Sequence, residues 1–523
     1  RCDDQAMSNA FTKYIHHVLT RPIKEMTVQR SIVVLSAVLA TVAFAPRSSA
    51  QVNKMTSGVA VPAPAVRDTS EVAIPQIAVP ESATIDTVKK IAGVRQKSSF
   101  LTTAPGIEMQ NYRPEDKRGI NVFEAPKDEG IGYDGFKLQW GAAFTQQFQG
   151  LDHSNTAAPR LVTTAGVTTD ANKLIRIGHG PNNATANLYL NGQLARGIRV
   201  AMTTYSSARH HNETWVKDGY LLVDASPIDW APLNNIMKYV TIRAGHFEIN
   251  YGDAHFRRTD NGNSIRNALV GNYIMDAFTT EVGGEVYVRA NGFLAMAGVT
   301  GGEVRGMITN PQKRSPSYLT KIGYDKQFSD DFRFRLTGSE YATASSVSNT
   351  LFSGDRAGSR YYDVLQNTSS TESAQAWSGA IQPGMSNSIH SYVINPFIQY
   401  RGLEFFGNFE RAKGRAATET ANRTWKQNVG EVVYRFLPDQ RVYVAARYNT
   451  VKGQLTVGTP DVSVKRTQIG AGWFLTPNVL TKLEYVNQKY FGYPKRKIGL
   501  GKKKRKPLAE VASAERYGTP FKL

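Results

Sequence analysis

The sequence predicts an all-β protein, a transmembrane antiparallel β-barrel of about 16 strands whose last strand is missing or replaced. Three observations lead to this fold class. Segments of about ten residues alternate apolar and polar side chains, as membrane-spanning strands do. Tight turns and long loops follow these segments alternately, which is typical of such barrels. The 523 residues contain one cysteine, Cys2, so no disulfide framework is available to support a small secreted fold.

The N-terminal quarter has no barrel pattern. Residues 1–25 look like an upstream extension. Residues 26–50 have the features of a secretory signal peptide: one basic residue near the start, an apolar run, and small residues before Gln51. Residues 51–134 are expected to form a periplasmic, proline-rich linker and a pre-barrel segment, because repeated prolines favour an extended chain without a core. Within this region, residues 96–134 either continue the linker or form a short plug.

The barrel is predicted over residues 135–490. It begins at Phe136, where Leu138, Trp140 and Phe144 alternate with polar or small residues. With one weaker pair near residues 215–223, we count 15 strands. Because barrels of this kind have an even number, a sixteenth strand is missing. If the first strand runs outward, every tight turn lies on the periplasmic side. The predicted hairpins cover 184–202, 281–300, 318–336, 393–409, 429–448 and 469–490, and the long loops cover 151–182, 251–276, 305–315, 344–388 and 453–463.

One stretch, residues 239–263, is central to the predicted pore. Its apolar alternation changes phase after Gly245, which predicts a β-bulge at that glycine. A charged, turn-rich segment follows, so residues 251–276 are expected to form the third long loop and to fold into the lumen. The candidate constriction residues are Glu248, Asp253, His255, Arg257, Arg258 and Asp260.

Strand alternation also predicts which charges line the pore wall. If Ile198, Val200 and Met202 face lipid, Arg199 faces the lumen. A basic side chain on the lipid face would cost about 2–4 kcal/mol at the membrane midplane, which favours the inward position. The third loop would then hold charges opposite this wall, and such a transverse field with an excess of cations favours anions. The alternative is that the loop charges are only solvated at the surface. The other predicted wall residues are Arg333, Arg335 and Arg447.

Residues 243–252, RAGHFEINYG, resemble a motif of the phosphate-selective porin family. That motif has a glycine, a polar residue, Phe, Lys, a hydrophobe, Pro, an aromatic and a small residue. The resemblance in architecture covers residues 136–490 and implies a sixteen-stranded, trimeric porin for passive diffusion in the bacterial outer membrane. Gly245, Phe247, Tyr251 and Gly252 match the motif, whereas Glu248 stands in place of its lysine and Asn250 in place of its proline.

We therefore expect an outer-membrane porin that passes small hydrophilic solutes with a preference for anions. Its expected partners are outer-membrane lipid, these solutes, and further copies of itself in a homotrimer. No catalytic residue, cofactor or metal is expected, because the chain has no GxSxG, Walker A or HExxH motif, and His210, His211 and His255 lack ligand spacing. The mildly basic barrel region does not predict nucleic-acid binding. Alternatives are an outer-membrane transporter for hydrophobic compounds, a structural or adhesive barrel, and a soluble all-β sandwich or propeller.

The strand pattern ends after Tyr490. Residues 491–523 form an anomalous basic tail with KKKRK at 502–506. This run resembles a nuclear-localisation or nucleic-acid patch, which a secretory signal contradicts. We interpret the tail from about residue 494 as a reading-frame error or divergent segment in place of the closing strand. Without that strand, the barrel has an open edge that a membrane does not tolerate.

Overall fold

The fold is described from a computed structural model of the chain. It describes residues 109, 111–124, 127, 133–210, 213–304, 314–356, 358–371, 377–437 and 439–493. The expected signal peptide, most of the linker and the basic tail from residue 494 lie outside the described residues, so the predictions made for them stay predictions.

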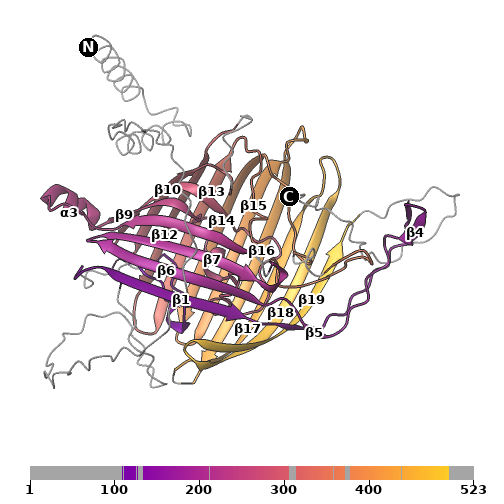
Figure 1. The fold of residues 1–523 in the computed structure, drawn as a ribbon, viewed down its shortest axis with the longest axis horizontal. Helices are drawn as coiled ribbons and strands as arrows, with labels where there is room; N and C mark the ends of the chain where they lie inside the picture. The colour runs from indigo at the N-terminus through magenta and orange to yellow at the C-terminus, as the bar shows by residue number, and fades with distance from the viewer. Residues whose placement is uncertain are drawn as a thin grey trace, which may run out of the picture. The chain divides into compact units, whose positions relative to one another are not determined.

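The described chain is built around one 15-stranded antiparallel sheet in which each strand pairs with its neighbours in the sequence (Figure 1). This confirms the predicted fold class and each predicted hairpin. The strands are β1 (Lys137–Thr145), β6 (Thr185–Ala195), β7 (Ile198–Ser207), β8 (Thr214–Val223), β9 (Val240–Glu248), β10 (Thr280–Ala290), β11 (Phe293–Thr300), β12 (Ser317–Gln327), β13 (Phe332–Thr343), β14 (Ser388–Tyr400), β15 (Leu403–Arg415), β16 (Arg423–Phe436), β17 (Val442–Gln454), β18 (Asp461–Thr476) and β19 (Val479–Phe491).

Smaller elements lie in the connections. The first long loop contains two short ladders that the sequence did not predict, β2 (Phe148–Gln149) with β5 (Gly180–Pro181) and β3 (Leu161–Thr164) with β4 (Val167–Asp170). The connection before β9 contains helix α3 (Ala231–Met237), which begins with a proline at its first turn. None of the helices among the described residues has the length and apolar character of a membrane-crossing helix.

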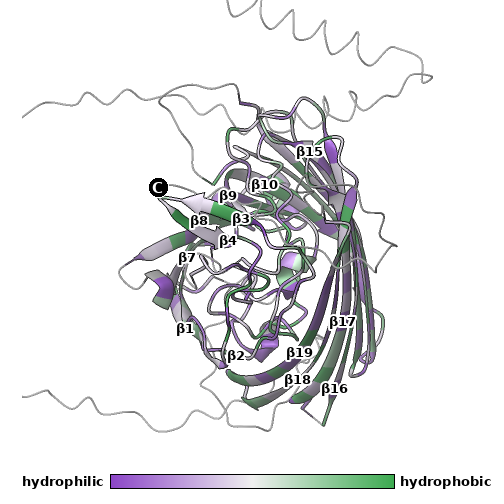
Figure 2. Ribbon diagram, turned by 90° about the vertical axis from the view of Figure 1, so that its right-hand side faces the viewer, coloured by the Kyte–Doolittle hydropathy of each residue, from purple (hydrophilic) through white to green (hydrophobic). Residues whose placement is uncertain are grey.

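The two faces of the sheet differ as a membrane barrel requires. Outward side chains are apolar and exposed; Ile322 at the middle of β12 is 69% exposed, and Ile394 is 54% exposed. Inward side chains at neighbouring positions, such as Lys321 and Asn395, are polar and buried. Figure 2 shows strands surrounding loop segments, with apolar and polar residues alternating along β16 to β18. The sheet is therefore a transmembrane β-barrel whose outer face meets lipid.

The sheet has two unpaired edges. Within the described residues, no hydrogen-bonded register joins β1 to β19. An odd number of antiparallel strands makes β1 and β19 run in the same direction, so one antiparallel strand between them would close the ring. Neither edge strand buries any side chain fully, whereas β14 buries every other residue over most of its length. Among the described residues, β1 and β19 are thus the unpaired edges of the sheet. The missing closing strand stays a prediction, because residues 494–523 lie outside the described residues.

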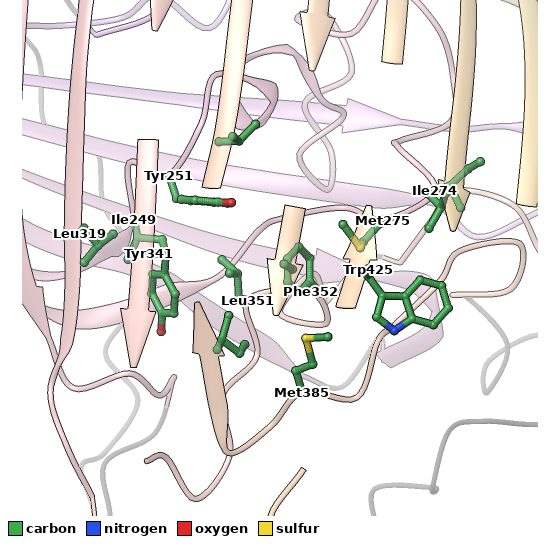
Figure 3. Packing of buried hydrophobic residues seen from close by; sticks show 14 of the residues in the cluster. Ile249, Tyr251, Ile274, Met275, Leu319, Tyr341, Leu351, Phe352, Met385 and Trp425 are labelled. Carbon is green, nitrogen blue, oxygen red and sulfur yellow. The ribbon is translucent and has the colours of Figure 1, made fainter. Parts of the chain in front are cut away.

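The third loop, residues 249–279 between β9 and β10, lies against the inner face of the sheet. Its apolar residues pack with inward side chains of the wall and with the loop between β13 and β14 (Figure 3). The core of this cluster contains Ile249, Tyr251, Ile274 and Met275 from the loop, with Leu319, Tyr341, Leu351, Phe352, Met385 and Trp425 around them.

The predicted bulge at Gly245 is wrong. The register of β9 with β10 is continuous from Val240 to Glu248, and its register with β8 is continuous through Gly245. The apolar phase changes because Phe247 points inward and is fully buried, since the loop covers the inner face there instead of water. Gly245 is required for another reason. Its φ is +139°, and a Cβ atom would lie 2.6 Å from the carbonyl oxygen of Gly219.

Candidate functional site

The start of the third loop is bound to the wall by a buried carboxylate. Asp253 accepts from Arg335 Nε at 2.8 Å and from Arg335 Nη2 at 2.7 Å, and it lies 2.7 Å from Lys321 Nζ. Burial alone would raise the pKa of Asp253, but Arg335 and Lys321 lower it to about 2. Arg333, one of the predicted wall residues, binds both oxygens of Asp325. These strands and the loop therefore form one ion-paired unit.

The loop arginines Arg257 and Arg258 point in different directions. Arg257 donates to Glu431 at 2.8 Å and lies 3.3 Å from Glu404. The predicted wall residue Arg447 binds the same Glu431 at 2.6 Å. Arg257 and Arg447 therefore both contact the carboxylate of Glu431. The expected arrangement, in which the loop arginine lies across open space from the wall arginine, is not observed. The physical reason is that two buried cations need a shared anion between them.

Arg258 binds the far end of its own loop and the loop between β13 and β14. Its Nε and Nη2 atoms donate to Asp276 at 3.0 Å and 2.7 Å, and Nη2 also binds Asp355. Its guanidinium lies over the ring of Phe278 at 4.2 Å, and its side chain is fully buried. Arg258 thus mainly holds the two loops together, although its side chain also lines the cavity described below.

A second segment lies in the lumen. Residues 111–124, here named the plug segment, contact both the wall and the third loop. Glu115 pairs with Arg266 of the loop at 2.6 Å, and Asn121 accepts from Arg257. At its far end, Glu124 pairs with Lys321 at 2.9 Å and with Arg335 at 2.8 Å. Residues 111–124 thus bind charged side chains of both the third loop and the wall.

The plug segment lies near the short-turn end of the barrel. The backbone N–H of Lys117 donates to the carbonyl oxygen of Pro477 at 3.0 Å, and the Lys117 ammonium binds the carbonyl oxygen of Asp439. Both acceptors lie in tight turns between strands. Phe123 fills an aromatic site, with its ring centroid 5.3 Å from that of Phe397 and 5.8 Å from that of Phe256.

The third loop, the plug segment and strands β6 to β10 line a cavity of about 200 Å³. This is far above the roughly 10–15 Å³ that one water molecule needs. Seven arginines and lysines and five carboxylates line it. It is therefore a polar, charged chamber within a barrel whose outer face is apolar. Of the predicted residues, Arg199, Glu248, His255, Arg258 and Asp260 line this chamber, whereas Asp253, Arg257, Arg333, Arg335 and Arg447 do not.

Most charges at the loop end of the chamber are paired. Lys217 lies 2.5 Å from Glu248 and 2.7 Å from Asp260, and His255 Nδ1 lies 2.6 Å from Glu248. Burial lowers the pKa of His255 despite the neighbouring carboxylate, so the imidazole is neutral near pH 7. A register shift between β7 and β8 lets the adjacent residues Lys217 and Asp218 both face inward.

Arg199 differs from these paired cations. Its side chain lines the chamber, the residue is only 6% exposed, and its Nη1 donates to the amide oxygen of Asn191 at 2.6 Å. Among the described residues it has no carboxylate partner, and its Nε atom has no hydrogen-bond partner. Arg113 of the plug segment also lines the chamber and donates to two backbone carbonyl oxygens, those of Gly119 and Phe256. Both guanidinium groups therefore retain positive charge that no carboxylate of the described chain neutralises.

The residues that match the family motif hold the base of the third loop. The Tyr251 hydroxyl donates to Glu410 at 3.0 Å and contacts the Ser391 hydroxyl at 2.5 Å. Gly252 has a φ of +71°, and a Cβ atom there would meet Val393 at 3.0 Å. Tyr251 and Gly252, together with Gly245 and Phe247, determine where the chain leaves β9 and turns into the lumen. No metal-binding group of three His, Cys, Asp or Glu side chains occurs in the part of the chain that the structure describes.

Among known proteins, the chain is similar only to solved structures. No protein-family model matches the chain, and no curated protein matches it. Similar solved structures include OmpT of Vibrio cholerae, an outer membrane protein in its trimer form (10% identity, covering 68% of this chain and 90% of that chain, TM-score 0.39). The anion-selective porin from Comamonas acidovorans has 10% identity, coverage of 68% and 89%, and a TM-score of 0.40. The outer membrane channel DcaP of Acinetobacter baumannii has 9% identity, coverage of 69% and 93%, and a TM-score of 0.39.

These similar structures are outer-membrane proteins, porins and channels. At this identity and TM-score, no property of them carries over to the chain. The location of the protein follows from its own fold. An antiparallel barrel with an apolar, exposed outer face and a polar interior is the architecture of proteins in the bacterial outer membrane.

Proposed function

We propose that the protein is an outer-membrane porin for small hydrophilic solutes, with a preference for anions. The observation that carries this proposal is the chamber between the third loop and β6 to β10, which is lined by charged side chains and holds more cations than carboxylates. A polar chamber inside an apolar shell lowers the cost of moving a hydrated solute through the membrane. A net positive lining lowers that cost further for anions.

Arg199 is the residue that we assign to anion preference. An arginine that is paired with a buried carboxylate contributes little net field, because the two charges cancel at short range. Arg257 and Arg258 are paired in this way, whereas Arg199 has only an amide partner among the described residues. The field in the chamber therefore depends more on Arg199 than on the two loop arginines.

Conductance and ion selectivity in a planar bilayer test the proposal. We expect ohmic single channels that prefer chloride over potassium, and we expect Arg199→Ala to reduce this preference. The matched control is Arg401→Ala, which removes an exposed arginine in a tight turn whose partner is Asp331. Equal selectivity of the Arg199→Ala variant and the control would contradict the role of Arg199. No current from a folded, heat-modifiable barrel would contradict the porin function itself.

A second candidate function is a transporter for hydrophobic compounds. The plug segment and the apolar cluster around the third loop favour it, because such transporters need a lumen closed by folded chain. Uptake into proteoliposomes separates the two functions. A porin admits small polar solutes according to size and charge, whereas a transporter of the second kind takes up an apolar compound and excludes these solutes.

We also propose that the porin assembles as a homotrimer, as the motif resemblance implies. Light scattering of the detergent-solubilised protein measures its mass, and a monomeric mass would contradict this assembly.

A further inference from the structure

The plug segment places two carboxylates on cations of the lumen. Glu124 bridges Lys321 at 2.9 Å and Arg335 at 2.8 Å, both of which are wall residues with buried side chains. Glu115 pairs with Arg266 at 2.6 Å and accepts a hydrogen bond from Asn263, both in the third loop. The two carboxylates therefore reach the two sides of the pore, one on the wall and one on the loop.

Glu124 balances the charge of its surroundings. The cations at this place are Lys321, Arg333 and Arg335, and the other carboxylates are Asp253 and Asp325. Three cations thus face three carboxylates only when Glu124 is present. Burial would raise the pKa of Glu124, but Arg335 and Lys321 hold it well below its usual range, so Glu124 is ionised at neutral pH.

Arg266 depends on the plug segment in the same way. Among the described residues, Glu115 is its only ion-pair partner, and its Nε atom has no hydrogen-bond partner. Seven basic residues and five carboxylates line the chamber, and the plug segment supplies one of these basic residues (Arg113) and two of these carboxylates (Glu115 and Glu124). Without the segment, six basic residues would face three carboxylates, so the net positive charge of the lining would increase.

The contacts that hold the plug segment are of a kind that solutes can replace. The segment does not pair as a strand with any strand of the described sheet. It is held by side-chain ion pairs, by hydrogen bonds with the third loop, the wall and turn carbonyl groups, and by the apolar side chains of Ile120 and Phe123. A carboxylate of a solute presents the same two oxygen atoms as Glu115 or Glu124 to the same cations.

We propose that the plug segment is an internal ligand of the channel, and that Glu115 and Glu124 occupy two binding subsites for the carboxylate groups of permeating solutes. One subsite consists of Lys321 and Arg335, and the other of Arg266 with Asn263. While the segment is in place, it narrows the path and neutralises both subsites. When a carboxylate-bearing solute takes these cations, the segment leaves the path. This inference rests on the proposed porin function and adds its substrate class and a closed state.

The first test removes the two carboxylates and keeps the segment. The double variant Glu115→Gln/Glu124→Gln is compared with Asp116→Asn, which removes one charge from the same segment, where Asp116 pairs with Arg118 and not with the wall. In planar bilayers we expect the double variant to be open for a larger fraction of time. Its chloride-over-potassium permeability ratio should rise by about two- to tenfold. Asp116→Asn should behave as the natural chain does, and a double variant identical to it would overturn the proposal.

The second test holds the plug segment in place with a disulfide. The backbone hydrogen bond between Lys117 and Pro477 brings these positions close together, so we pair Lys117→Cys with Pro477→Cys in a chain that carries Cys2→Ser. The oxidised barrel should conduct little, and reduction should restore the current. If the oxidised and reduced barrels conduct equally, the plug proposal alone is overturned. If no variant conducts although the barrel is folded, the porin function is overturned and the plug proposal with it.

The third test uses succinate as the carboxylate probe. Adding succinate to the natural chain should increase the open fraction, and it should have much less effect on the Glu115→Gln/Glu124→Gln variant, whose segment no longer competes for the cations. The same concentration of an uncharged solute of similar size, glycerol, is the control. An equal response to succinate and glycerol would overturn the assignment of carboxylates as the ligand class.

Discussion

The two neighbouring arginines of the third loop should differ strongly in their contribution to stability. Arg258→Met removes the only cation that binds Asp276 among the described residues, and the Asp276 side chain is 14% exposed. Leaving one member of a buried ion pair without its partner costs about 3–5 kcal/mol. Arg257→Met removes a cation from Glu404 and Glu431, but Glu404 keeps Arg435 and Glu431 keeps Arg447. Two carboxylates then still face two cations, so we expect a cost of about 1–2 kcal/mol.

Urea unfolding of the barrel refolded into lipid vesicles, followed by tryptophan fluorescence, measures both free energies of unfolding. A third variant, Arg258→Met/Asp276→Asn, is the control, because it removes the charge that Arg258→Met leaves without a partner. It should recover a large part of the lost stability if the cost is electrostatic. The reasoning is refuted if Arg257→Met destabilises the barrel as much as Arg258→Met, or if the added Asp276→Asn substitution recovers nothing.

Three further predictions concern pH, backbone and lipid contact. Asp253 and Glu124 have pKa values lowered by their cationic neighbours, so their contribution to the free energy of unfolding is complete above about pH 4.5. In the same urea assay this contribution should be lost as the pH falls through the lowered values. Gly245→Ala should destabilise the barrel by about 1–3 kcal/mol in the same urea assay, whereas Gly338→Ala, where a Cβ atom would meet nothing within 4 Å, should change it little. Ile322→Arg should cost about 2–4 kcal/mol of unfolding free energy in vesicles, because it places a charge in lipid; an unchanged value would mean that the outer face of β12 does not meet lipid.

The fold was predictable because lipid and lumen impose a period of two on each strand. The outward positions of β7 and β12 are mostly apolar and the inward positions are mostly polar, and a single residue of shift would place charges in lipid. Turn and loop lengths then gave the order of the strands. The short ladders of the first long loop were missed because neither runs longer than four residues, which leaves too little sequence for a periodic signal.

The inward direction of the wall arginines was also predictable, but their partners were not. Arg257 and Glu431 are 174 positions apart in the sequence, and nothing in a local pattern connects them. A signal for the carboxylates was nevertheless present, because Glu404 and Glu431 occupy inward positions in strands that the alternation predicts. Lys217 and Asp218 gave no such signal, because two adjacent residues cannot both face inward in a regular strand.

The pairing of charges decides how the pore selects, more than the number of charges does. A transverse field requires cations and anions that remain separated across the path, yet Arg257, Arg335 and Arg447 all touch carboxylates. Each of these contacts brings opposite charges within about 3 Å, so their fields cancel over the distance at which a solute passes. What remains is the charge without a carboxylate. In the present state this is Arg199 of the wall and Arg113 of the plug segment, and once the segment has left it is Arg199 and Arg266. The position of the plug segment therefore sets the selectivity of the pore as well as its width.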